Sequence, residues 1–216
     1  MKYKAIVFDM DGTILDTLDD LMDGVNYMLA QKGFPQRSRK EIRDFVGNGV
    51  ARLVNLSVPA DTSAEEREEC IGIFKTYYNA HLRVKTAPYA GILPLLQKLR
   101  ELGLKTAVVS NKFQEGVTGL AEDFFPGLFD YAIGEAAGLA RKPAPDMVWK
   151  ALDLLGVSKE EALYVGDSDV DGDTAANSQL DFAAVTWGFR DREVLETKDP
   201  VVILDRPEEF LSFLLK

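Results

Sequence analysis

Two aspartates stand two residues apart near the beginning of the chain, directly after a short apolar run. The run is Ala5–Phe8, and the segment that follows it is Asp9-Met10-Asp11-Gly12-Thr13. Residues two apart on an extended chain point the same way, so Asp9 and Asp11 would present two carboxylates side by side at the end of a strand. Open α/β sheets bind ligands at that end, although Asp and Gly also make plain solvated turns.

Two further polar segments follow apolar runs in the same way. Ser110-Asn111-Lys112 comes after Leu104–Val109 and offers a hydroxyl, an amide and backbone N–H groups at an expected helix start, which suits an anion. Ser and Asn are also common helix N-caps. Arg141-Lys142-Pro143 comes after a third apolar run, Phe129–Ile133. A lysine beside a rigid proline can hold a point charge against a phosphate, although a single loop lysine is usually solvated.

The segment Gly166–Asp173 carries four aspartates and follows the apolar run Ala162–Val165. So many like charges repel one another unless a cation lies among them, and hard oxygen donors suit Mg²⁺. Helix capping explains one or two of these acids but not four. The spacing also matches the first half of an EF-hand calcium loop, but Ser178 stands where the bidentate Glu is required.

The elements that must position these residues alternate between strand and helix patterns. Short apolar runs of the kind that form buried strands occur six times, at Ala5–Phe8, Leu104–Val109, Phe129–Ile133, Ala162–Val165, Phe182–Thr186 and Val201–Leu204. Helical stripes lie between most of them, for example at Leu95, Leu96 and Leu99. This alternation predicts an α/β fold with a doubly wound parallel sheet.

A helical insertion interrupts this alternation after the first strand. Residues 17–84 contain three helical patterns and no convincing strand, near Leu18–Lys32, Lys40–Leu56 and Ala64–Leu82. Thr62 or Ser63 is the expected N-cap of the last of these helices. We therefore expect a core domain formed by residues 1–16 and 85–216 and an inserted all-helical domain over residues 17–84. The Pro- and Gly-containing stretch Thr86–Gly91 suits the boundary.

Composition excludes several classes of function. The chain has 216 residues, and 35 acidic against 25 basic side chains give a net charge of −10, which argues against nucleic acid and anionic membranes as partners. No apolar run approaches the roughly 18 residues of a membrane span, and the N-terminal run is too short for a signal peptide. The single cysteine, Cys70, excludes an internal disulfide and fits a reducing compartment. A cytoplasmic enzyme is the expectation.

The four motifs, taken in order at successive strand ends, resemble the haloacid dehalogenase superfamily of aspartate-based phosphohydrolases. The resemblance covers essentially the whole chain and implies a Rossmann-like core with a helical cap domain. It implies a nucleophile, a general acid/base, a hydroxyl of the second motif, a lysine and two metal-binding acids at Asp9, Asp11, Ser110, Lys142, Asp167 and Asp171.

The resemblance also implies how these residues work together on a phosphate monoester. Mg²⁺ would be held by Asp9, Asp167 and the main-chain carbonyl of Asp11, while Asp171 would support the metal or pair with Lys142. Asp9 would form an aspartyl-phosphate, and Asp11 would act first as acid and then as base. The phosphoryl oxygens would be bound by Thr13, Ser110, Asn111 and Lys142.

Within the insertion, Val46–Val54 resembles the cap segment of phosphoglycolate phosphatases, which implies that the substrate is read by Gly47, Asn48, Gly49 and Arg52. Ser178-Gln179 departs from the Ala-Gly that is common in the family. We expect a Mg²⁺-dependent phosphomonoesterase that acts on a small phosphorylated metabolite, and 2-phosphoglycolate is the first candidate for this substrate. Another small-phosphate hydrolase, a phosphosugar mutase, and a non-catalytic phospho-receiver or scaffold are the alternatives. Monomer and homodimer both stay open.

Overall fold

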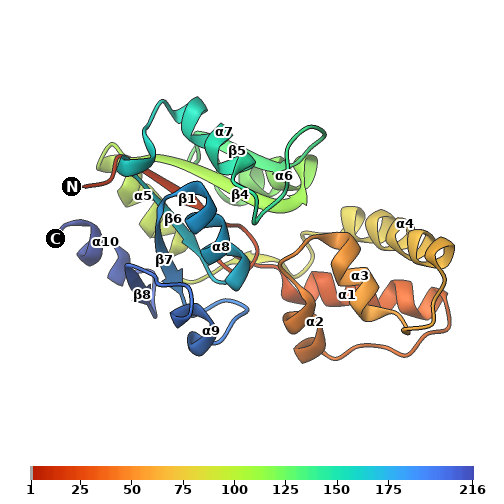
Figure 1. Ribbon diagram of the computed structural model, residues 1–216. Coiled ribbons are helices and arrows are strands. Elements are labelled where there is room, and N and C mark those ends of the chain that lie inside the picture. Colours follow the sequence, from red (N-terminus) through yellow and green to blue (C-terminus); the bar gives the residue numbers. More distant parts are fainter. Residues whose placement is uncertain (1) are drawn as a thin grey trace. The chain divides into compact units, whose positions relative to one another are not determined.

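The computed structural model describes residues 2–216 and contains a six-stranded, all-parallel sheet (Figure 1). The strand order is β5-β4-β1-β6-β7-β8, with β1 at the centre. The strands are β1 (Ala5–Phe8), β4 (Lys105–Phe113), β5 (Tyr131–Glu135), β6 (Ala162–Gly166), β7 (Asp181–Val185) and β8 (Val202–Leu204). This parallel sheet confirms the predicted doubly wound α/β fold. The central strand β1 is apolar throughout, as expected for a strand that is covered on both faces.

Helices cover both faces of this sheet. They are α5 (Ile92–Glu101), α6 (Gln114–Phe124), α7 (Asp146–Leu155), α8 (Asp169–Ser178), α9 (Arg192–Glu196) and α10 (Glu209–Leu214), with a 3₁₀ turn at Lys159–Glu161. On one face, Val7 and Tyr164 belong to a buried cluster with the apolar stripe of α7. On the other face, Phe8 packs against the rings of Phe129 and Phe210. Alternate residues of β1 thus face opposite helical layers.

The strand β4 is longer than the sequence predicts. Leu104–Val109 was expected to end at Ser110 with a helix start, but β4 continues to Phe113 and α6 begins only at Gln114. The expectation of a helix start at Ser110 is therefore wrong. The reason is tertiary: after a register shift, Phe113 pairs with Glu135 of β5, which keeps the polar segment extended. The other predicted strands agree within two residues.

The inserted residues form a second compact unit, Asp16–Ala87, and the rest of the chain forms the first. The helices of the Asp16–Ala87 unit are α1 (Leu18–Gln31), α2 (Arg39–Phe45), α3 (Val50–Ser57) and α4 (Ala64–His81). Ser63 is the N-cap of α4 and accepts a hydrogen bond from the N–H of Glu66. The prediction of one helix over Lys40–Leu56 is wrong, because Gly47 and Gly49 adopt φ values of 123° and 81° and break it.

Asp20 fastens the end of this unit to its beginning. Its side chain is buried at 2% exposure, and it accepts hydrogen bonds from the N–H groups of Lys85 and Thr86 and from the hydroxyl of Thr86. Nearby, β2 (Leu15–Asp16) and β3 (Ala87–Pro88) pair as a two-stranded ribbon. The two strands are the segments through which the chain leaves and re-enters the sheet domain.

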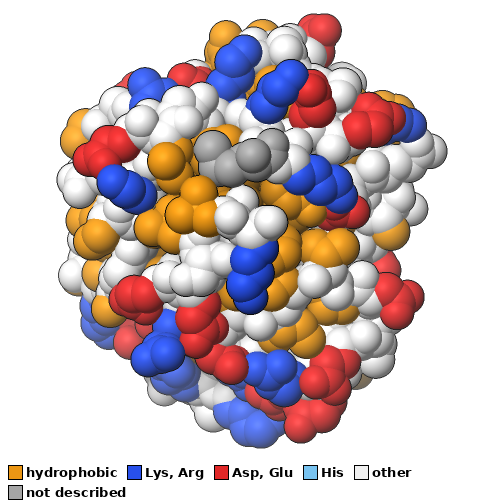
Figure 2. All heavy atoms as spheres, turned by 90° about the vertical axis from the view of Figure 1, so that its left-hand side faces the viewer, with side chains coloured by type: hydrophobic (Ala, Val, Ile, Leu, Met, Phe, Trp, Pro, Cys, Tyr) orange, Lys and Arg blue, Asp and Glu red, His pale blue; other side chains and the backbone are white. Residues whose placement is uncertain are grey.

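The face that carries both chain termini shows no field of a single charge sign. In Figure 2, hydrophobic side chains gather across the middle of this face, and Lys, Arg, Asp and Glu side chains surround them. A polyanion-binding surface would need basic side chains grouped together. The basic side chains on this face are interspersed with acidic ones and do not form such a group.

We predict that Asp20→Ala lowers the free energy of unfolding by about 2–4 kcal/mol, because it leaves the buried N–H of Thr86 and the partly buried N–H of Lys85 without their acceptor. Asp23→Ala is the matched control, since Asp23 forms only a partly exposed ion pair with Lys85, and it should cost less than about 1 kcal/mol. Urea denaturation of both variants measures the difference. Equal losses would show that the Asp20 hydrogen bonds do not hold the unit together.

Candidate active site

The carboxyl ends of β1 and β6 bring together the acids that lie far apart in sequence. One carboxylate oxygen from each of Asp9, Asp167 and Asp171 lies within 4.8 Å of the others, and all three residues are buried. Parallel strands deliver them to the same edge, because Phe8 of β1 lies beside Val165 of β6. The arrangement is a compact set of hard oxygen donors, of the kind that suits a divalent cation.

A tight turn after β1 positions the first motif. The N–H of Asp9 donates to the carbonyl of Val165, and the backbone then turns so that the N–H groups of Ile14 and Leu15 both donate to the carbonyl of Met10. Gly12 has φ 89°, and a Cβ there would overlap the carboxylate of Asp167. The position therefore requires glycine for both its backbone angle and its close approach to the acid.

Asp167 is held by donors from two other segments. The hydroxyl of Thr13 donates to Oδ1 at 2.7 Å, and the N–H of Phe189 donates to Oδ2 at 2.7 Å. The indole of Trp187 donates to the carbonyl of Thr13 at 2.9 Å. A Cβ at Gly188 would overlap both the Asp167 carboxylate and the carbonyl of Gly12. The segment 187–189 thus supports the acid, directly through the backbone N–H of Phe189 and indirectly through the indole of Trp187.

Lys142 lies at the centre of the cluster. Its ammonium is 2.6 Å from Oδ1 of Asp9, 2.9 Å from Oδ1 of Asp171 and 3.1 Å from the hydroxyl of Tyr164. The side-chain amide of Asn111 fixes the Lys142 backbone, accepting from its N–H at 2.8 Å and donating to its carbonyl at 3.0 Å. Both the charge and the loop that carries it are therefore held in place.

Asp171 has a structural role at the start of α8. Its Oδ2 accepts hydrogen bonds from the N–H groups of Asp167 and Ser168 and from the Ser168 hydroxyl, in a capping box. The four aspartates of this motif therefore separate into two pairs. Asp167 and Asp171 are buried in the cluster, whereas Asp169 and Asp173 form ion pairs with Arg190 and Lys198.

Burial is the largest influence on the titration of the cluster. It raises the pKa of Asp9 well above the ordinary 3.8, and Asp171 adds to the rise while Lys142 opposes it. Burial and the charge of Asp171 raise the pKa of Asp167 to about 7. Burial alone would lower the pKa of Lys142, but Asp171 and Asp9 outweigh it and raise that pKa well above 10.5. A further cation beside Asp9 and Asp167 would favour the ionised forms of both acids.

A second lysine, Lys112, for which the sequence alone predicts no role, lies beside Asp11. Its Nζ lies 3.1 Å from Oδ1 of Asp11, and Lys112 is only 5% exposed. The hydroxyl of the buried Ser110 accepts from the N–H of Lys112 at 3.2 Å. The extension of β4 past the expected strand end is what carries these two side chains to the site.

The four residues expected to read the substrate lie in the inserted unit. Gly47, Asn48 and Gly49 are half-buried in the connection between α2 and α3, and Arg52 is exposed on α3. The two glycines give this connection its left-handed backbone. The role of these residues stays a prediction.

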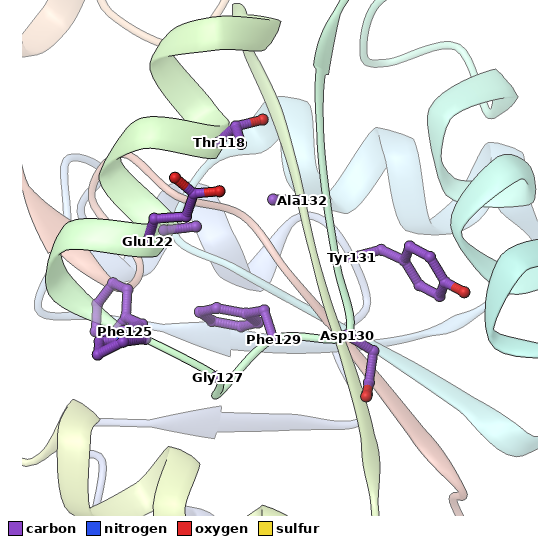
Figure 3. A pocket seen from close by; sticks show the side chains of 10 residues that line it. Thr118, Glu122, Phe125, Gly127, Phe129, Asp130, Tyr131 and Ala132 are labelled. Atoms are coloured by element: carbon purple, nitrogen blue, oxygen red, sulfur yellow. The ribbon is translucent and has the colours of Figure 1, made fainter.

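A separate hollow lies beside α6 and the beginning of β5, with a volume of about 390 Å³. Figure 3 shows Thr118 and Glu122 on the helix, Phe129 beneath them, and Tyr131 turned away across the strand. Asp130 on its rim is engaged by Arg100 and by the N–H of Thr106. The hollow sits at the amino end of β5 and brings none of the motif residues together.

The helices of residues 2–216 include none with the length and apolar character that a membrane span requires.

Comparison with known proteins gives matches that span these motifs. A family model described as haloacid dehalogenase-like hydrolase matches residues 6–185. The phosphoglycolate phosphatase of Aquifex aeolicus is 31% identical over 98% of this chain and 96% of that protein. The phosphoglycolate phosphatase of Rhodobacter capsulatus is 32% identical over 97% and 93%. A Lactobacillus delbrueckii subsp. bulgaricus crystal structure, provisionally named phosphoglycolate phosphatase, is 41% identical with TM-score 0.92 over 97% of each chain.

We predict that Gly188→Ala displaces Asp167 or the Gly12 turn and lowers the free energy of unfolding by about 1–3 kcal/mol, because the new methyl group has no space. Gly72→Ala is the matched control: it lies in α4 with open space around it and should stabilise by about 1 kcal/mol through helix propensity. Chemical denaturation compares the two. If Gly188→Ala were as stable as the wild type, the close packing on Asp167 would not be required.

Proposed function

Because the chain belongs to the haloacid dehalogenase-like hydrolase family, we propose that it hydrolyses phosphate monoesters and that its substrate is 2-phosphoglycolate. The observation that carries the proposal is that the buried carboxylates of Asp9 and Asp167 lie close together and that the ammonium of Lys142 contacts Asp9. Asp11 follows in the same turn, where it contacts Lys112. The substrate is supported by relatives named phosphoglycolate phosphatase that align over nearly the full chain.

Mg²⁺ fits the donors that this site provides. Asp9, Asp167 and the main-chain carbonyl of Asp11 would hold it, because the first two offer buried oxygens close together. Burial and the negative charge of Asp171 raise the pKa of both acids, and a bound cation would oppose that rise. When bound, Mg²⁺ supplies the charge that lets an anionic ester approach these carboxylates. With Mg²⁺ bound, Asp9 and Asp167 would both stay ionised. Oδ1 of Asp171 accepts hydrogen bonds from the ammonium of Lys142 and the hydroxyl of Tyr164, so we assign Asp171 to orienting Lys142.

The chain's own residues account for both chemical steps. A carboxylate oxygen of Asp9 attacks phosphorus in line, the P–O bond to the leaving group breaks, and the leaving oxygen takes a proton from Asp11. Asp11 then takes a proton from a water molecule, whose oxygen attacks phosphorus and breaks the bond to Asp9. Inorganic phosphate leaves and Asp9 is restored. Lys142, 2.6 Å from Asp9, stabilises the negative charge that develops on the phosphoryl oxygens.

The phosphoryl group is held by the segments around the nucleophile. We assign the hydroxyl of Ser110, the N–H of Asn111 and the ammonium of Lys142 to its oxygens. The hydroxyl of Thr13 was predicted to bind phosphate, but it donates to Asp167, so we assign it to positioning that acid. The side chain of Asn111 acts on the Lys142 loop.

The inserted unit is proposed to act as the cap. Its expected bounds are residues 17–84, and Gly47, Asn48, Gly49 and Arg52 would contact the leaving group when the site is closed. A cap that excludes water protects the phospho-enzyme from reaction in the wrong geometry. The paired linkers β2 and β3 are the segments where such a movement would hinge.

We predict that Asp9→Asn abolishes phosphate release from 2-phosphoglycolate, by at least about 1,000-fold, because an amide is not a nucleophile toward phosphorus. Phosphate release from a panel of small esters, with Mg²⁺ or with EDTA, measures it. Asp173→Asn is the matched control, since Asp173 pairs with Lys198 outside the cluster and should keep its activity. Full turnover by Asp9→Asn would refute the mechanism, and equal turnover of all esters would refute the substrate.

We predict that Mg²⁺ stabilises the protein more at about pH 8 than at about pH 5.5. A carboxyl whose pKa is raised on folding makes the metal-free protein less stable as the pH rises from about 4 to 7, because the folded state binds more protons there. A cation must displace these protons at low pH but not at high pH. Saturating Mg²⁺ should raise the melting temperature by roughly 5–10 °C at the higher pH and much less at the lower. The same gain at both values would contradict a site formed by Asp9 and Asp167.

A further inference from the structure

Lys112 is a buried ammonium beside the acid/base, and the phosphoryl chemistry described above does not use it. Its Nζ lies 3.1 Å from Oδ1 of Asp11, and its side chain is 4% exposed. Among residues 2–216, no donor meets hydrogen-bond geometry at that oxygen, so the contact between Lys112 and Asp11 is an ion pair without a hydrogen bond. Lys142 differs, since it makes short hydrogen bonds to Asp9 and Asp171.

The fold places the two lysines on different carboxylates. β1 and β4 are parallel neighbours, with Phe8 beside Val108, and β4 continues to Phe113. This extension carries Lys112 beyond the end of β1, to the turn that contains Asp11. Lys142 comes from the loop before α7 and reaches the nucleophile instead. One ammonium therefore stands on the side of the attacking oxygen and the other on the side of the proton donor.

We propose that Lys112 binds an anionic group carried by the leaving group of the substrate, which for 2-phosphoglycolate is its carboxylate. The inference rests on the proposed function and makes Lys112 a specificity-determining residue. Asp11 must come within about 2.7–3.0 Å of the leaving oxygen to protonate it. In 2-phosphoglycolate a single methylene carbon separates this oxygen from the carboxylate carbon. An ammonium beside Asp11 is therefore within reach of the carboxylate.

The charge balance of the site favours the same assignment. A second anionic group brought beside Asp11 would meet a like charge in a buried place, which is unfavourable without a cation next to it. Lys142 is already committed to Asp9 and Asp171. The ammonium of Lys112 already lies beside Asp11, so its positive charge would offset the negative charge of both Asp11 and an incoming carboxylate. A neutral leaving group gains nothing from this exchange, so the residue discriminates in favour of anionic ones.

The test compares two esters that differ only at the end of the leaving group, 2-phosphoglycolate and 2-hydroxyethyl phosphate. Lys112→Met should lose activity on both but lower the ratio of their kcat/KM values by about 10–100-fold, the range of one charge-assisted hydrogen bond. Lys112→Arg should recover most of the ratio, because it keeps the charge. Lys98→Met is the matched control, since Lys98 is an exposed partner of Glu101 and should leave the ratio unchanged.

An unchanged ratio in Lys112→Met, with both activities lowered equally, would overturn the inference and leave Lys112 as a support for Asp11 alone. Binding separates this result from failure of the proposed function. In an Asp9→Asn background, calorimetry measures the affinity of each ester without turnover. There, Lys112→Met should weaken 2-phosphoglycolate about 10–100-fold relative to 2-hydroxyethyl phosphate even if the wild type hydrolyses neither. Equal weakening of the two would again overturn it.

Discussion

Repulsion among buried carboxylates is the constraint on which the rest of the sheet domain depends. Asp9, Asp167 and Asp171 place oxygens within 4.8 Å of one another away from water, where like charges interact strongly. Each acid is held against this repulsion by its own donors: the ammonium of Lys142, the N–H of Phe189, and the first turn of α8. These contacts fix the geometry of the acids, and a bound cation would offset the negative charge that they leave in the site.

The same crowding explains where glycine is required. A Cβ at Gly12 or Gly188 would overlap the carboxylate of Asp167, and a Cβ at Gly166 would overlap Asp171. In each case the backbone comes close enough to an acid to fix it or to donate to it, which a side chain would prevent. The glycines next to the acids are therefore part of the site, although they carry no functional group.

Most of the core architecture could be predicted from the sequence, because strands buried on both faces are apolar throughout and motifs that follow them must meet at one edge. Ala5–Phe8 is β1 residue for residue for this reason. Three features needed tertiary information. β4 continues through polar residues because β5 pairs with it. Lys112 contacts Asp11, which lies about a hundred residues away in the sequence, and Gly188 acts only by leaving space.

Gln179 stands where the family commonly has glycine. Its φ of 61° is a left-handed angle that favours glycine.

The two lysines show how one residue type can serve two needs that differ in rigidity. A phosphoryl group has the same shape in every ester, so the charge that stabilises it works best when it is fixed, and Lys142 is fixed through both its ammonium and its backbone. The leaving group differs between substrates, so a charge that recognises it must be able to change partners. In the proposed mechanism Lys112 takes this part, since its ammonium lies beside the proton donor Asp11 and not beside the nucleophile. In the proposed mechanism, the side chains at the carboxyl ends of the strands carry out the same chemistry on every ester, and Lys112 on the extension of β4 selects among leaving groups.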